Sequence, residues 1–84
     1  MDLKFQQLKT IVMNNQKIIP KEIDVDFLLK SSLPSFMAFL STNLKQYENS
    51  IEGIIRDRLK NESFNQENLE LFIKLLKLFL KYAI

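Results

Sequence analysis

Apolar residues recur along this chain at intervals of three and four, the spacing that places them on one face of an α-helix. The first such stripe consists of four residues, Phe5, Leu8, Ile11 and Val12. We expect a helix over residues 2–15 with Asp2 as its N-cap. It would end near Asn15, since asparagine tolerates the left-handed conformation that closes many helices.

Residues 16–23 are expected to form a connection whose isoleucines pack onto the core. Ile19 precedes Pro20, and a residue before proline is biased toward extended geometry. A short helix over 24–30 should follow, with Asp24 as its N-cap.

The third segment has the longest regular pattern. Seven apolar positions are spaced alternately by four and three residues: Leu33, Met37, Leu40, Leu44, Tyr47, Ile51 and Ile54. This spacing predicts one long helix over 33–61, with Ser31 or Ser32 as its cap and Pro34 in its first turn. A break near 48–50 is the alternative, because weak helix formers gather there. We favour a continuous helix, since a break would normally reset the phase of the stripe.

The last helix has the clearest start. Asn65 is its predicted N-cap, and Phe64 and Leu69 flank the cap in the arrangement of a hydrophobic staple. Glu67 places negative charge in the first turn, where the helix dipole favours it. We expect this helix over residues 66–83.

Four charged residues follow in this last helix: Glu70, Lys74, Lys77 and Lys81. At about 100° per residue they fall within an arc of roughly 60°, and most of the remaining circumference is apolar. Three interpretations are open. The helix is a central core helix with one line of lysines in solvent, or it packs on its own bundle and on another chain, or it lies on a membrane surface.

Composition sets the class. Eighty-four residues make at most one domain, 1–84, and one Gly with two Pro argues against an all-β fold with its many turns. The chain has no Cys, so no disulfide can stabilise so small a core. Helix packing must supply the stability, helped by oligomerisation. No signal peptide or membrane span is apparent, and we expect a cytoplasmic protein.

Catalytic motifs are missing. Without Cys or His, neither a nucleophile–histidine pair nor the common zinc sites can form, and one glycine cannot make a phosphate loop. Asp24 and Asp26 read as a cap and a first-turn acid. Glu52 reads as an ion-pair partner of Arg56, four residues away. We expect no catalytic residue, no metal, no cofactor and no enzymatic activity.

Nucleic-acid binding is an alternative function. Its candidate basic patch is Arg56, Arg58, Lys60, Lys74, Lys77 and Lys81. The net charge is only +2, however, and acidic residues interrupt the patch. A solvated helix end explains the same residues.

We therefore expect an all-α bundle of about four helices that forms a homodimer and binds a protein partner through helix faces. A small regulator or inhibitor of the phage or mobile-element type fits these features. The interface candidates are Phe36, Phe39, Tyr47, Leu71, Leu75, Leu78 and Tyr82. A further alternative is a membrane-surface or immunity-type bundle that uses the C-terminal helix. In size, mild basicity and helix count the chain is similar to the small helical immunity proteins that protect bacteriocin producers, a likeness of fold with no motif behind it.

Overall fold

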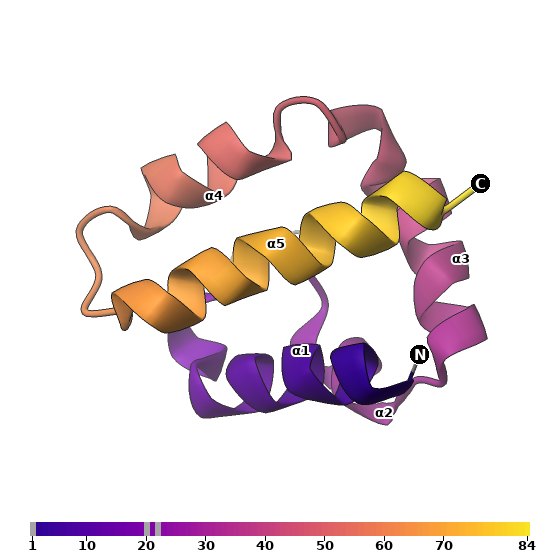
Figure 1. Ribbon diagram of the computed structural model, residues 1–84, viewed down its shortest axis with the longest axis horizontal. Helices are drawn as coiled ribbons and strands as arrows, with labels where there is room; N and C mark the ends of the chain where they lie inside the picture. The colour runs from indigo at the N-terminus through magenta and orange to yellow at the C-terminus, as the bar shows by residue number, and fades with distance from the viewer. Residues whose placement is uncertain (1, 20, 22) are drawn as a thin grey trace.

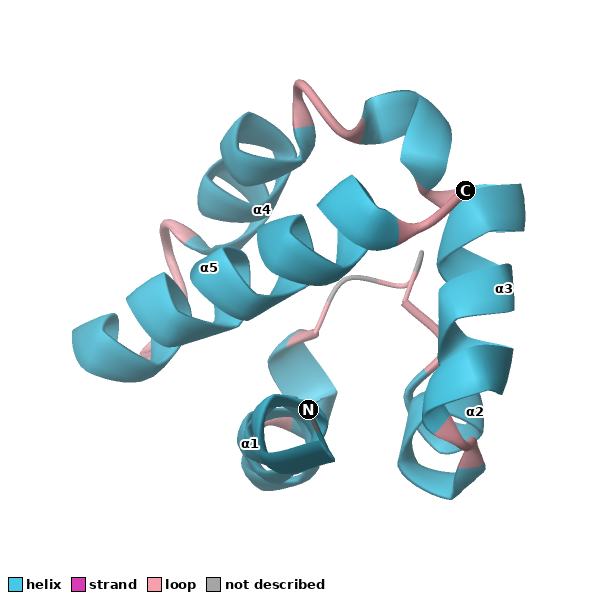
Figure 2. Ribbon diagram, turned by 45° about the vertical axis from the view of Figure 1, so that its right-hand side comes forward, coloured by secondary structure: helices cyan, strands magenta, loops and turns pink. Residues whose placement is uncertain are grey.

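The computed structural model describes residues 2–19, 21 and 23–84 of the chain. These residues contain five α-helices, α1 (Asp2–Asn14), α2 (Val25–Lys30), α3 (Leu33–Asn43), α4 (Ile51–Leu59) and α5 (Gln66–Tyr82). Single 3-10 turns lie at Gln16–Ile18 and Lys45–Tyr47. The described residues contain no strand, so the predicted all-α fold is confirmed (Figure 2). The helices form one bundle measuring 32 × 24 × 20 Å.

Side-chain caps start three of the helices as predicted. Asp24, Ser32 and Asn65 precede α2, α3 and α5, and each accepts a hydrogen bond from the backbone amide three residues later. The donor–acceptor distances are 3.0, 3.4 and 3.1 Å respectively. The local signals in the sequence therefore fix where these helices begin.

The end of α1 differs from the prediction. Asn15 has a φ of −137° rather than a left-handed conformation. Its side-chain amide instead donates a 2.7 Å hydrogen bond to the carbonyl of Ile11 and so satisfies the end of the helix. Ile19 is extended and buried, as expected. The predicted cap by Asp2, the side chain of Ile18 and the geometry of Pro20 lie outside what the structure describes.

The prediction of one continuous helix over 33–61 is wrong. α3 ends at Asn43, a 3-10 turn follows, and α4 begins at Ile51 after a further turn (Figure 2). Two side chains bond backwards to carbonyls near the break, Asn43 to Phe39 and Ser50 to Tyr47. Such bonds compete with helix continuation.

The size of the bundle explains why the helix breaks. A straight helix over 33–61 would be about 43 Å long at 1.5 Å per residue, whereas the longest dimension of the molecule is 32 Å. By turning near residues 44–50, the chain lays both halves against α5 (Figure 1). Six apolar side chains are thereby buried: Phe36, Leu40 and Leu44 on one side of the break, and Ile51, Ile55 and Leu59 on the other. Of the predicted stripe itself, Leu40, Leu44 and Ile51 are buried, whereas the other four positions are half-buried or exposed.

α5 is the central helix of the fold. It packs against α1, α3 and α4 (Figure 1). It buries seven side chains of its own: Leu69, Phe72, Ile73, Leu75, Leu76, Phe79 and Leu80. At its C-terminal half the rings of Phe5, Phe36 and Phe79 form a cluster, with centroids 5.4 to 6.0 Å apart. α5 is therefore a core helix on the sides that face α1, α3 and α4, and the covering of its outer side by another chain or by a membrane stays a prediction.

Candidate functional site

The flank of α5 that faces α4 carries a closed network of ion pairs. The guanidinium of Arg56 donates to both carboxylate oxygens of Glu70 at 2.8 Å and to Glu52 at 3.0 Å. Lys77 donates to the other oxygen of Glu52 at 2.9 Å. Gln66 donates to Glu70 as well, at 2.8 Å. The predicted pair of Glu52 and Arg56 is thus confirmed, within a larger network that joins two helices.

These contacts shift the pKa values of three groups at the centre of the network, Glu52, Glu70 and Arg56. Hydrogen bonds from Lys77 and then from Arg56 lower the pKa of Glu52 below its usual value of 4.5. The hydrogen bonds of Arg56 likewise lower the pKa of Glu70. In return Glu70, and then Glu52, raise the pKa of Arg56. Each charge is therefore balanced inside the network.

The predicted basic patch does not form one face. Arg56 and Lys77 are taken up by the network, and Lys60 lies 3.3 Å from Asp57. Arg58 lines a separate small pocket. Lys74 and Lys81 line a hollow on the outer side of α5 together with Lys77, whose ammonium group pairs with Glu52.

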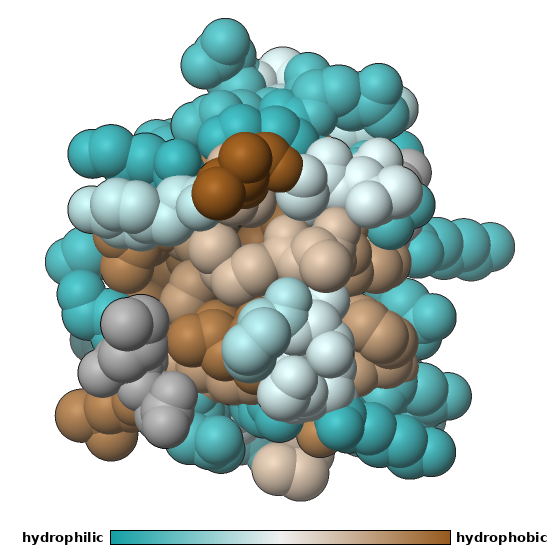
Figure 3. Space-filling view, turned by 90° about the vertical axis from the view of Figure 1, so that its right-hand side faces the viewer, coloured by the Kyte–Doolittle hydropathy of each residue, from teal (hydrophilic) through white to brown (hydrophobic). Residues whose placement is uncertain are grey.

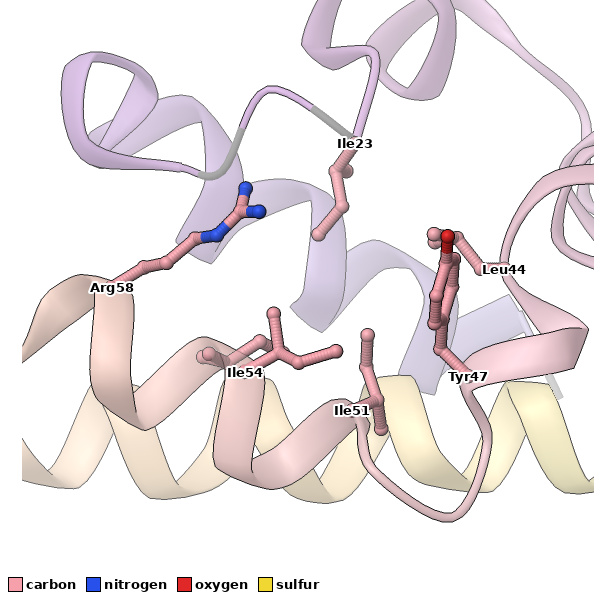
Figure 4. Close-up of a pocket in the computed structure, with 7 residues that line it drawn as sticks. Ile23, Leu44, Tyr47, Ile51, Ile54 and Arg58 are labelled. Atoms are coloured by element: carbon pink, nitrogen blue, oxygen red, sulfur yellow. The ribbon is translucent and has the colours of Figure 1, made fainter.

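The pocket beside Arg58 lies where α3 gives way to α4. It is walled by Ile23, Leu44, Ile51, Ile54 and Ile55, while Tyr47 and Arg58 bring polar ends to it from opposite sides (Figure 4). Its volume of about 100 Å³ is well below the roughly 300–1,000 Å³ of typical ligand sites. We therefore regard it as a packing feature of the break.

Two adjoining hollows lie on the outer side of α5, and we call them together the α5 groove. The first, of about 560 Å³, runs over Leu71, Leu75 and Leu78 and is bordered by lysines. The second, of about 760 Å³, lies where the start of α1 and the start of α3 meet the end of α5. Lys4 and Leu78 line both, so the two hollows adjoin.

The second hollow is almost wholly apolar. Apart from Lys4 it is lined by Leu3, Leu33, Met37, Leu78, Phe79 and Tyr82. Leu3 is 74% exposed and Tyr82 is 64% exposed, although both are large and mainly apolar. Figure 3 views the end of the molecule that carries α3, where brown hydrophobic surface spreads across the middle and teal hydrophilic surface surrounds much of it.

The structure divides the predicted interface candidates into three groups. Phe36 is buried in the core, and Leu75 is buried as well, although it lines the bottom of the first hollow. Phe39 is half-buried and its ring lies tilted against that of Phe27, and Tyr47 lines the small pocket. The remaining three, Leu71, Leu78 and Tyr82, line the α5 groove.

Sequence reasoning missed the other wall of the groove. Leu3 and Lys4 lie in the first turn of α1, a segment considered only for its core-facing stripe. Leu33 and Met37 belong to the predicted apolar seam, but their partial burial follows from the packing of the helices and is not readable from the spacing of the seam.

A further hollow of about 520 Å³ lies at the end of α1, and Met13 is the apolar residue among the polar ones that line it. Residues 2–19, 21 and 23–84 contain no group of three or more potential metal ligands. None of the described helices has the length and apolar character needed to cross a bilayer. No family model, curated protein or solved structure matches the chain. Any functional conclusion must therefore come from the groove itself.

Proposed function

We propose that this protein is a non-enzymatic interaction module that binds a partner protein in the α5 groove. One observation carries the proposal. Apolar side chains from α1, α3 and α5 converge on an open hollow, where Leu3 and Tyr82 stay mostly in solvent instead of completing the core. Exposed apolar surface of this kind is costly to leave in water and marks interaction sites.

The proposal also accounts for the size of the protein. A protein that acts by binding to a larger partner needs only a stable fold and one binding surface. A small regulator or inhibitor, such as phages and mobile elements carry, works in this way.

The experiment uses the chain as bait in a lysate of its source cells, in three forms. The groove variant is Leu78→Gln/Tyr82→Gln, which removes apolar contact without adding charge. The matched control is Met13→Gln, because Met13 is 54% exposed and lies outside the groove near the end of α1. The wild type completes the set, and circular dichroism verifies that all three are folded.

We expect a protein that the wild type and Met13→Gln retain and that the groove variant loses. Equal retention by all three forms, or loss from the control as well, would place the interaction elsewhere and overturn the proposal.

Nucleic-acid binding has less support, because Arg56 and Lys77 already pair with carboxylates of the same chain. It predicts filter retention of DNA or RNA that falls steeply between low and high salt. Retention that is weak and independent of salt would eliminate it.

A further inference from the structure

The rim of the α5 groove carries positive charge that no described carboxylate offsets. Lys4, Lys74 and Lys81 line it, and none of them lies within ion-pair distance of a carboxylate in the part of the chain that the structure describes. Glu48 is the one carboxylate among the described lining residues, and it already pairs with Lys45 at 3.0 Å. The groove is therefore apolar along its floor and basic along its edge.

The floor has the length and spacing that suit a helix. Leu71, Leu75, Leu78 and Tyr82 follow one another at intervals of four, three and four along α5. The stripe extends for about 16 Å, roughly three helical turns. An amphipathic helix docks into such a groove through anchors at every third or fourth position.

We propose that the α5 groove takes an acidic amphipathic helix from another protein. Its apolar face covers the leucines and Tyr82, and its carboxylates meet Lys4, Lys74 and Lys81. The inference rests on the proposed function and adds the chemistry of the partner to it. Complementary charge around an apolar centre fixes both the encounter and the register of such a complex.

Charge also distinguishes this occupant from a second copy of the chain. In a twofold-symmetric dimer the same patch faces itself. The three lysines of one copy would then confront those of the other, with no described carboxylate of the groove left to offset them. Shape disfavours a membrane surface, because the leucines line a concavity instead of projecting from the molecule.

The test uses three synthetic peptides as probes. All share leucines at helical spacing on one face, and they differ only in the flanking residues, which are Glu, Gln or Lys. Fluorescence anisotropy measures the affinity of the full chain for each peptide at low and at high salt. Sedimentation with vesicles of anionic and of zwitterionic lipid, and light scattering of the free protein, run beside it.

We expect the Glu peptide to bind about tenfold or more tightly than the Gln peptide at low salt, the sum of a few exposed ion pairs. The Lys peptide should bind most weakly. Salt should narrow the difference, because exposed charges are screened.

Two pairs of substitutions assign the effect to the rim. Lys74→Gln/Lys81→Gln should weaken the Glu peptide several-fold and leave the Gln peptide unchanged. The matched control Lys17→Gln/Lys30→Gln removes the same charge from exposed positions outside the groove and should change neither. Leu78→Gln/Tyr82→Gln should weaken all three peptides.

Equal affinity for the Glu and Gln peptides would overturn the inference and leave the proposed function standing, since the groove would bind without regard to charge. Absence of binding to any peptide would overturn it as well. So would preferential sedimentation with anionic vesicles, or a dimer that dissociates on Leu78→Gln/Tyr82→Gln. The proposed function fails separately, if the groove variant keeps every protein that the wild type captures.

Discussion

Both flanks of α5 carry lysines, and the two flanks differ in whether these charges pair with carboxylates of the described chain. On the α4 flank, Arg56 and Lys77 are matched by Glu52 and Glu70 at 2.8 to 3.0 Å. On the outer flank, Lys4, Lys74 and Lys81 have no described carboxylate within pairing distance, and Tyr82 is 64% exposed. The charges of the α4 flank are therefore paired among the described residues, whereas three lysines of the outer flank are not.

The difference separates residues that hold the protein together from residues that are available to a partner. Balanced charges on the α4 flank tie α4 to α5 and offer little to a phosphate or a second protein. Unpaired lysines beside exposed apolar surface are stabilised by contact with a partner that brings carboxylates and apolar side chains. The same lysine-rich helix thus contributes to both, and composition alone does not distinguish the two uses.

The largest effect on stability should come from the inner, core-facing side of α5, which supports both flanks. Leu80 is fully buried on the inner face of α5, so Leu80→Ala should lower the free energy of unfolding by about 2–5 kcal/mol. Urea denaturation measures this change. Leu3→Ala, at a position 74% exposed, is the control and should cost less than about 0.5 kcal/mol. Similar costs for both would contradict the assignment of Leu80 to the core.

A smaller effect should come from a substitution that stabilises α4, the helix of the ion-pair network. Gly53 lies inside α4, and a β-carbon built there meets nothing within 4 Å. Gly53→Ala should therefore stabilise the protein by roughly 0.5–1 kcal/mol through helix propensity. That corresponds to a rise of a few degrees in Tm. Binding to the α5 groove should stay unchanged, and a fall in Tm would show that α4 needs glycine for another reason.

The smallest effect concerns acid. The pKa values of Glu52 and Glu70 are lowered in the folded chain. Their ion pairs therefore stabilise the fold at any pH above 4.5, the ordinary pKa of a glutamate. This contribution is lost as the pH falls through the lowered pKa values. Glu52→Gln/Glu70→Gln should flatten the decline of Tm on acidification below pH 4.5, while Glu62→Gln should not. A decline as steep in the double variant as in the wild type would show that the network contributes nothing measurable.

Local signals in the sequence were enough for the starts of three helices, α2, α3 and α5. The side chains of Asp24, Ser32 and Asn65 bond to nearby amides, so their effect is readable from a few residues. The same holds for Glu52 and Arg56, which lie one helical turn apart. Contacts of this range depend little on the rest of the fold.

Longer-range features could not be read in this way. The break between α3 and α4 left no mark on the apolar spacing, because the buried Leu44 and Ile51 on either side of it lie seven residues apart, close to two helical turns. Glu70 reaches Arg56 across fourteen residues of chain. The α5 groove needs Leu3, Met37 and Leu78, which meet only when three helices pack. Tertiary packing decides each of these, and no local pattern encodes it.

The most direct test of the account is to map where a ligand contacts α5. Nuclear magnetic resonance would follow the backbone amides of the labelled chain as the Glu peptide is added. We predict shifts at Lys74, Leu78 and Tyr82 and at the start of α3, with Glu52 and Arg56 unchanged. Shifts centred on Glu52 and Arg56 instead would contradict the claim that the outer flank of α5 is the binding surface.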